Sequence, residues 1–192
     1  MMHSLEGAYK IKFKGSKGRC AHEFILDCSE FKDLCGVTET DIAKRLIDFG
    51  FHAPTMSWPV AGGIMIEPTE SEDLYEMNRY IHALLTIRQE IQEIIDGKQH
   101  AELNTLKLAP FTLPELMKES WEYSFSREKA GYPAPWLHDL GKVFPTVARI
   151  DDAYGDRHLN IKAPEVSEFF KYEDGIDNEP VLTFQEKQRK LE

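Results

Sequence analysis

The densest group of side chains that could perform chemistry lies in the stretch RIDDAYGDRH. Asp156, Arg157 and His158 follow a Tyr-Gly pair, which is typical of a turn and could aim the three side chains into a cleft. Arg157 is the strongest candidate, because a guanidinium can pair through two hydrogen bonds with a carboxylate or a phosphate. The alternative is a solvated loop in which Arg157 pairs with Asp151 or Asp152 and only stabilises the turn.

A second candidate is the loop HAPTMSWPV, residues 52–60. Pro54 and Pro59 restrict the backbone and remove two hydrogen-bond donors, and each favours an extended conformation in the residue before it. A simple change of chain direction needs no such sequence. We therefore predict a rigid loop that faces a cleft and presents His52 and Thr55 to it.

Other patterns of catalytic or metal-binding residues are missing from the sequence. The histidines form no HxH or HExxH pattern, so we predict no metal site. The three cysteines, Cys20, Cys28 and Cys35, match no zinc spacing and are predicted to be reduced thiols packed as small apolar side chains. There is also no glycine-rich phosphate loop and no GxSxG motif. Local motifs alone therefore indicate no particular reaction.

The composition limits the class of protein. The 192 residues are 42% hydrophobic and 11% aromatic, which is enough for one sizeable core or two small ones. The formal net charge of −10 argues against nucleic acid or an anionic membrane as the main partner. No apolar run approaches the roughly 20 residues that span a bilayer, and the first residues lack a signal-peptide pattern.

Hydrophobic periodicity predicts a compact unit over residues 1–100. Its elements are a β-hairpin at 8–28, a helix at 39–49, a strand at 63–66 and a long helix at 71–96. This order is typical of a two-layer α+β domain with a mainly antiparallel sheet and helices on one face.

Capping patterns predict where the two helices begin. Thr38 with Asp41, and Thr69 with Glu72, each place a hydroxyl residue three positions before an acid, as in a capping box. Gly97 follows the last apolar position of the long helix and would end it.

The pattern changes after residue 100. Residues 101–164 are rich in proline and large aromatic side chains but show little periodicity, so we predict an extended strap that packs on the same domain or on a missing larger one. Residues 165–192 are predicted to form an acidic, mobile tail.

Several long stretches resemble the C-terminal end of the glycine decarboxylase family, the P-protein of the glycine cleavage system. They are GRCAHEFILD, DIAKRLIDFGFHAPTMSWPV, GIMIEPTESE and PTVARIDDAYGDRHL, and the resemblance runs from about residue 5 to about residue 164. Enzymes of this family are much longer, with two homologous halves of the fold type I, aminotransferase-like class that binds pyridoxal phosphate (PLP). The resemblance implies that this chain is the last small domain of such an enzyme.

The resemblance also implies a cofactor, a substrate and partners. The full-length enzyme would use PLP to decarboxylate glycine and would transfer the aminomethyl group to the lipoyl arm of H-protein. In the family the PLP lysine belongs to a His-Lys motif upstream of this region, and no His-Lys dipeptide occurs here. We therefore expect no PLP bound to this chain, which would be inactive alone.

The remaining partners implied are the rest of the enzyme chain, or its other subunit, and further copies in a homo-oligomer. The expected compartment is the cytoplasm for a bacterial parent and the mitochondrial matrix for a eukaryotic one. Two alternatives stay open: a stand-alone α+β binding or regulatory module without catalysis, and an independent enzyme that uses the RIDDAYGDRH cluster.

Overall fold

The computed structural model describes residues 1–159. The predicted tail at 165–192 and the last residues of the strap lie outside the described residues. The chain divides into a first unit, Met1–Ile150, and a second unit that begins at Asp151, and each is described by itself.

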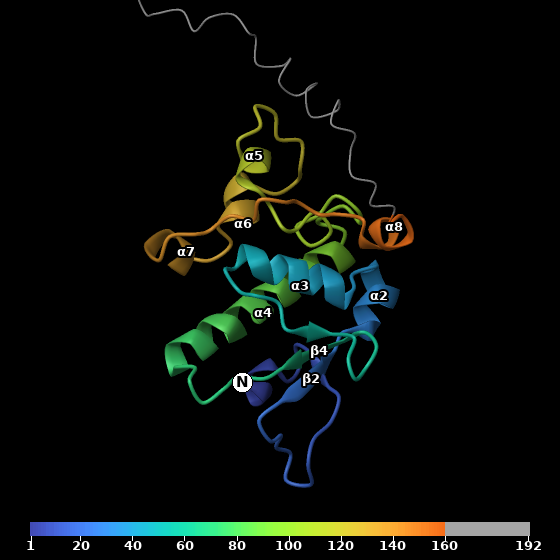
Figure 1. The fold of residues 1–192 in the computed structure, drawn as a ribbon, viewed down its shortest axis with the longest axis vertical. Coiled ribbons are helices and arrows are strands. Elements are labelled where there is room, and N and C mark those ends of the chain that lie inside the picture. Colours follow the sequence, from blue (N-terminus) through green and yellow to red (C-terminus); the bar gives the residue numbers. More distant parts are fainter. Residues whose placement is uncertain (160–192) are drawn as a thin grey trace, which may run out of the picture. The chain divides into compact units, whose positions relative to one another are not determined.

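The first unit is an α+β domain, as predicted (Figure 1). Its N-terminal part carries the sheet and the longest helix, whereas the part after residue 100 carries only short helices. The elements in chain order are α1 (Met2–Leu5), β1 (Lys10–Ile11), β2 (Phe24–Asp27), α2 (Ser29–Cys35), α3 (Glu39–Asp48), β3 (Thr55–Met56), β4 (Gly63–Ile66), α4 (Leu74–Ile95), α5 (Leu113–Leu116), α6 (Arg127–Gly131) and α7 (Trp136–Asp139).

The sheet has four strands in the order β1-β2-β4-β3, and every neighbouring pair is antiparallel. The central pair is the longest, with Phe24 opposite Ile66 and Asp27 opposite Gly63. All four residues of β2 are buried, which explains the continuous apolar run of its first three residues. The predicted mainly antiparallel sheet is therefore confirmed.

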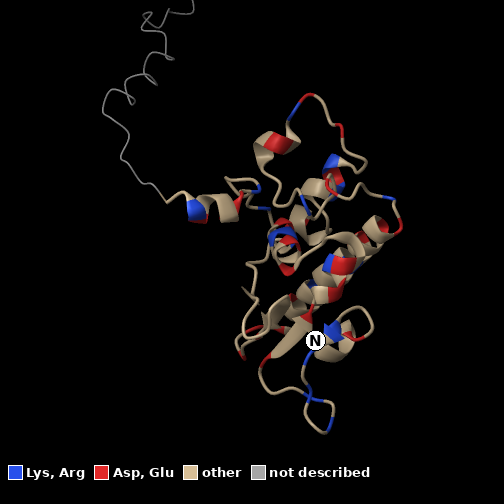
Figure 2. Cartoon of the chain, turned by 90° about the vertical axis from the view of Figure 1, so that its right-hand side faces the viewer, with Lys and Arg blue, Asp and Glu red and all other residues tan. Residues whose placement is uncertain are grey.

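The predicted hairpin at 8–28 exists, but its strands are shorter than the alternation suggested. Lys10 pairs with Asp27 and Ile11 with Leu26, and then the two chains separate into a long loop. Phe13, which continues the apolar alternation, is 62% exposed because it lies beyond the paired residues. Figure 2 shows lysines and arginines in blue on this loop, at the lower end of the view.

Helix α3 begins with the predicted capping box. The Thr38 hydroxyl accepts a hydrogen bond from the Asp41 backbone N–H, and the Asp41 carboxylate accepts one from the Thr38 backbone N–H at 2.8 Å. The apolar side chains of Ile42 and Leu46 on its inner face are fully buried. The helix ends at Asp48, one residue before the predicted end.

Helix α4 begins later than predicted, at Leu74 rather than at residue 71. Asp73 caps it, since its carboxylate accepts a hydrogen bond from the Glu76 backbone N–H at 2.7 Å. The Thr69 hydroxyl instead bonds to Ser71 within a turn. The prediction of a capping box at Thr69 was therefore wrong, because the Asp73 carboxylate, four residues further along, caps the helix instead.

One apolar core joins the central strands to the helices of the N-terminal part. It contains fully buried side chains from β2, α2, α3, β4 and α4, among them Leu26, Phe31, Leu46, Ile64, Leu84, Ile87 and Ile91. Figure 1 shows α3 and α4 lying above β2 and β4. A second, smaller core lies in the strap and consists of Phe111, Leu116, Phe125 and Ala130.

Helix α2 and strand β3 are among the elements that had no sequence prediction. Helix α2 directly follows β2 and ends at Gly36, whose φ of +75° is a left-handed conformation that favours glycine. Strand β3 lies inside the proline-rich loop at 52–60 and forms the edge of the sheet next to β4.

Candidate functional site

A cleft of about 340 Å³ lies where the segment after α3, the end of β4 and the first turn of α4 meet. A volume of this size is sufficient for a small ligand. Its lining is mostly apolar, and the charged side chains on it are glutamates. The lining residues are Met1, Gly50, Phe51, His52, Pro54, Ile66, Glu67, Pro68, Glu72, Glu76, Met77 and Tyr80.

The two residues predicted from the proline-rich loop have different positions. His52 is exposed and lines the cleft. Thr55 is exposed too, but it belongs to β3, where it pairs with Met65, and it is not part of the cleft lining. The structure therefore places only His52 at this cleft.

The loop is held by contacts with α3 and β4. Ser57 donates its backbone N–H to the Gly63 carbonyl at 2.8 Å, and its side chain contacts Glu39 of α3. Ser57 has a φ of +52°, which is uncommon for a residue other than glycine. Trp58, the next residue, is 69% exposed. The loop is thus fixed at its centre while it presents a large apolar side chain to the outside.

Asp156, Arg157 and His158 lie in the second unit, in or directly after helix α8 (Asp152–Arg157). The predicted turn at Tyr154-Gly155 was wrong, since both residues are helical. The helix forms because the Asp151 carboxylate caps it, accepting a hydrogen bond from the Tyr154 backbone N–H at 2.8 Å.

The alternative in which Arg157 pairs with an aspartate of its own segment is not found. Among residues 1–159, Arg157 forms no ion pair with Asp151 or Asp152. The His158 ring stacks on the Tyr154 ring at a centroid distance of 3.9 Å. That Asp156, Arg157 and His158 face a cleft stays a prediction.

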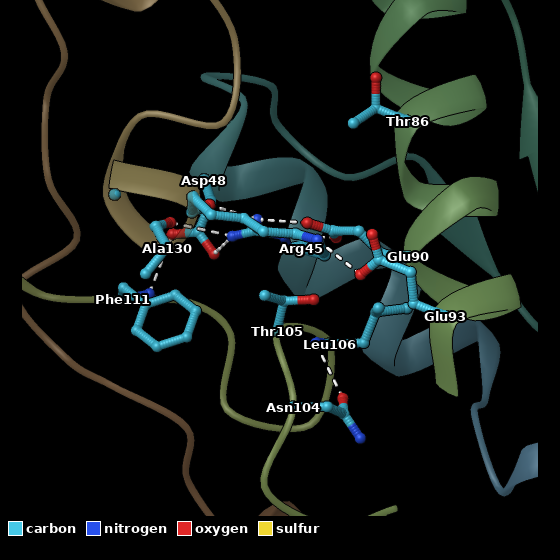
Figure 3. Close-up of polar contacts among 12 residues, drawn as sticks. Arg45, Asp48, Thr86, Glu90, Glu93, Asn104, Thr105, Leu106, Phe111 and Ala130 are labelled. Carbon is cyan, nitrogen blue, oxygen red and sulfur yellow. Dashed lines mark hydrogen bonds and ion pairs between the residues drawn. The ribbon is translucent and has the colours of Figure 1, made fainter. Parts of the chain in front are cut away.

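A buried ion-pair network lies between α3, α4 and the strap (Figure 3). Arg45 is fully buried and binds both carboxylate oxygens of Glu90, at 2.9 and 2.7 Å. It also donates to Asp48 at 3.0 Å and to the backbone carbonyls of Lys129 and Ala130. These contacts satisfy the buried guanidinium and tie the strap to α3.

Asp48 and Lys142 extend this network. The second carboxylate oxygen of Asp48 accepts the Phe111 backbone N–H at 2.9 Å and lies 3.7 Å from the Lys142 ammonium. Lys142 donates to the backbone carbonyls of Asp48 and Gly131. Burial lowers the pKa of Lys142 to about 8 despite the nearby carboxylate, and burial raises the pKa of Asp48.

A second ion-pair cluster lies at the other end of α3. The Asp41 carboxylate pairs with Lys107 and with Arg149, each at 2.9 Å. Arg149 also donates to the backbone carbonyls of Leu106 and Ala109. Both ends of one helix therefore hold the strap by buried or half-buried charges.

These networks were missed by sequence reasoning. Arg45 lies three residues after Ile42 and one before Leu46, on the apolar face of the predicted helix. An arginine on such a face is a signal for a buried ion pair, because an unpaired buried charge is very costly. Its partners could not be named, since Glu90 and the carbonyl of Ala130 are far away in the sequence.

One group of possible metal ligands lies on the surface. His22 Nε2 is 3.8 Å from a carboxylate oxygen of Glu23 and 3.8 Å from one of Glu67. All three residues are exposed, and exposed acidic groups often gather without an ion.

Among the described residues, no helix is both long and apolar enough to cross a membrane.

The first unit is a small α+β domain with a cleft beside α4, and its residues 101–150 are attached by buried ion pairs and by apolar side chains of the large core. The chain belongs to the family described as glycine dehydrogenase, C-terminal domain, whose model matches residues 1–111. The resemblance inferred from the sequence is thereby confirmed.

Curated relatives are similar over most of the chain. Glycine dehydrogenase (decarboxylating) of Bdellovibrio bacteriovorus is 50% identical over 165 residues, which are 86% of this chain and 17% of the relative. The mitochondrial protein of the same name from Gallus gallus is 49% identical over 169 residues, 88% of this chain and 17% of the relative. The human mitochondrial protein is 48% identical over 164 residues, 85% of this chain and 16% of the relative. The chain thus spans about a sixth of their length.

Proposed function

We propose that this chain is the C-terminal domain of a glycine dehydrogenase (decarboxylating). The complete protein would release the carboxyl group of glycine as CO2 and transfer the aminomethyl group to the lipoyl group of H-protein. The observation that carries the proposal is the identity of about half of the residues, over 85% or more of the chain, to relatives with this name.

The cleft described above does not fit the cofactor that the family implies. PLP needs a lysine for its Schiff base and cationic or N–H groups for its phosphate. The cleft lining contains three glutamates and no lysine or arginine. Lys142 is buried, but its ammonium is already bound to two backbone carbonyls. This supports a PLP site of fold type I in another part of the complete protein.

The role we propose for this domain is to close the active-site cleft of the complete protein against water and to shape the passage for the lipoyl arm. A domain with this role must present ordered surfaces. The fixed loop around Ser57 and the doubly anchored strap support it, because both hold exposed side chains in defined positions. We also propose that the complete protein forms homo-oligomers, in the bacterial cytoplasm or the mitochondrial matrix.

The direct test is to assay the complete protein with lipoylated H-protein for CO2 exchange with glycine. Exchange that requires both PLP and H-protein is the expected result. If the complete protein carries PLP and binds H-protein but leaves glycine unchanged, the proposed reaction is wrong.

Arg157 is the site residue that we propose to act on an anion, such as a carboxylate, a phosphate or an acidic protein surface. Replacing it by lysine keeps the charge but loses the planar pair of donors. We expect Arg157→Lys in the complete protein to lower kcat/KM at least ~10-fold, or roughly 1.4 kcal/mol, with an unchanged Tm. Arg19→Lys, on the exposed hairpin loop, is the matched control. Unchanged activity with a lowered Tm would make Arg157 purely structural.

A further inference from the structure

We propose that the cleft between the segment after α3 and the first turn of α4 binds a primary ammonium group on a short aliphatic stem. This inference concerns the ligand of the cleft on this domain and does not depend on the decarboxylase activity. It rests on the charge of the cleft, its apolar walls and its fixed geometry.

The charge of the cleft favours a cation. Glu67, Glu72 and Glu76 line it, and no lysine or arginine is part of the lining. Glu76 is paired with Arg79, and Glu67 lies 3.8 Å from the imidazole of His22. Glu72 forms no ion pair with any other residue of the described range 1–159. At least one carboxylate thus remains for a ligand cation, whereas a phosphate or carboxylate ligand would be repelled.

The walls of the cleft favour an aliphatic stem. Phe51, Ile66 and Met77 contribute apolar surface, and Pro54 and Pro68 add ring carbons while offering no backbone N–H donors. Each Å² of apolar ligand surface that enters such a site contributes about 25 cal/mol. The few donors in the lining make a sugar or a nucleotide a poor match. A short alkyl amine can pack its carbon chain against the apolar walls and pair its ammonium group with a carboxylate.

The cleft is formed by side chains that are already held in place. The rings of Phe51 and Tyr80 meet edge to face at a centroid distance of 5.1 Å. The Arg79 guanidinium lies 5.1 Å from the centre of the Phe51 ring and also pairs with Glu76. Because these groups need little further ordering, most of the interaction energy is available for binding.

The experiment is an NMR titration of the ¹⁵N-labelled chain at pH 7 and low salt, with n-butylammonium and, separately, with n-butanol. The two probes share an aliphatic chain and differ in charge. We expect saturable shifts at Phe51, Met77 and Tyr80 with the amine, weakened by added NaCl, and at least ~10-fold weaker binding of the alcohol. Equal binding of the two probes, or no saturable shift at these residues, would overturn the proposal.

Variants of the cleft glutamates test which carboxylates the amine needs for binding. Removing one exposed carboxylate is expected to weaken amine binding about two- to fivefold, so Glu72→Gln should fall in this range and Glu67→Gln/Glu72→Gln should lose about tenfold. Glu128→Gln, on the exposed face of α6, is the control and should bind as the unaltered chain does. If the double variant matches the control, the cleft carboxylates do not recognise the amine.

A last titration distinguishes two sources of the ammonium group. Blocked lysine (N-acetyl-lysine methylamide) carries the same group as a partner protein would present it. Saturable shifts with blocked lysine at an affinity equal to or above that for butylammonium assign the cleft to a lysine side chain. Shifts with butylammonium alone assign it to a free alkyl amine. Absence of both overturns the proposal.

Discussion

Residues 1–100 and residues 101–150 belong to one unit and share its large core, but they differ in regular structure and in how much they rely on charged contacts. The N-terminal part has a four-stranded sheet, a 22-residue helix and a large apolar core. The strap has three helices of four or five residues and a core of four buried side chains. It is also attached to the N-terminal part by Leu106, Ala134 and Leu137, which are buried in the large core, and by the charged contacts of Asp41, Arg45 and Asp48.

The strap has a defined position although it has little regular secondary structure. Short helices and proline-bounded turns satisfy few of their own backbone groups. In the strap, Arg45, Lys142 and Arg149 bind backbone carbonyls, so charged side chains replace regular hydrogen bonding. Position then depends on a few specific contacts, and loss of one should affect the strap more than the sheet.

The largest expected effect comes from Arg45→Met. This variant leaves Asp48 and Glu90 buried without their shared partner, and breaking a buried ion pair typically costs about 3–5 kcal/mol. We expect a loss of this size in the free energy of unfolding, measured with urea, and faster hydrogen exchange in the strap. Lys32→Met, on the exposed side of α2, serves as control. A loss below about 1 kcal/mol would refute the anchoring role.

Gly131→Ala tests the small core of the strap. A Cβ at this position would collide with the Leu116 side chain, and such overpacking costs about 1–3 kcal/mol. Gly155→Ala in α8 is the matched control, since nothing lies within 4 Å of its Cβ, and it should be neutral or stabilising by up to ~1 kcal/mol. We expect faster hydrogen exchange in the strap, with the sheet unchanged. Equal exchange in both parts would mean that the two parts unfold together.

Lys142 gives the strap a distinctive pH dependence. Its folded pKa of about 8 lies below the ordinary 10.5, so between these values the unfolded chain binds more protons and this lysine contributes stability that rises with pH. We expect the unfolding free energy of the unaltered chain, relative to Lys142→Met, to increase by about 1 kcal/mol between pH 7 and 9.

The comparison with Lys142→Met is necessary because Cys28, Tyr9 and Tyr80 act in the opposite direction. Burial raises their pKa values, that of Cys28 to about 12, so they lower the stability of both chains equally as the pH rises above about 9. A constant difference between the two chains would contradict the burial of the Lys142 ammonium.

The smallest expected change in stability comes from removing the hydroxyl groups of the two capping patterns in the N-terminal part. Thr38→Ala removes a hydroxyl that accepts the Asp41 N–H at 3.4 Å, and because this bond is long we expect a loss of about 0.5–1 kcal/mol. Thr69→Ala should change the stability by less, since Asp73 caps α4. Equal losses in urea unfolding would mean that Thr69 stabilises the helix start as well.

The sequence predicted the elements whose signals are local. Alternation located the hairpin, a short apolar run located β4, and apolar periodicity located α3 and α4. Prediction from the sequence failed where two neighbouring residues could each cap the same helix, as Thr69 and Asp73 could for α4. It also failed where the element was short. Helix α2 has seven residues and a single buried one, Phe31, so it shows no apolar periodicity. Tyr154 and Gly155 form a pair that is typical of turns, but the N-cap at Asp151 favours a helix.

The site was predictable only in part. The prolines of HAPTMSWPV indicated a constrained loop, and His52 does line the cleft. The residues that line that cleft come from segments between Met1 and Tyr80 that are far apart in the sequence, so no local pattern could assemble them. The family, the α+β class and the start of α3, which has a single capping solution, could be predicted from the sequence. The binding of Arg45 to Glu90 and to the strap could be seen only in the folded chain, because the partners of a buried charge are the groups that pack around it and not its neighbours in sequence.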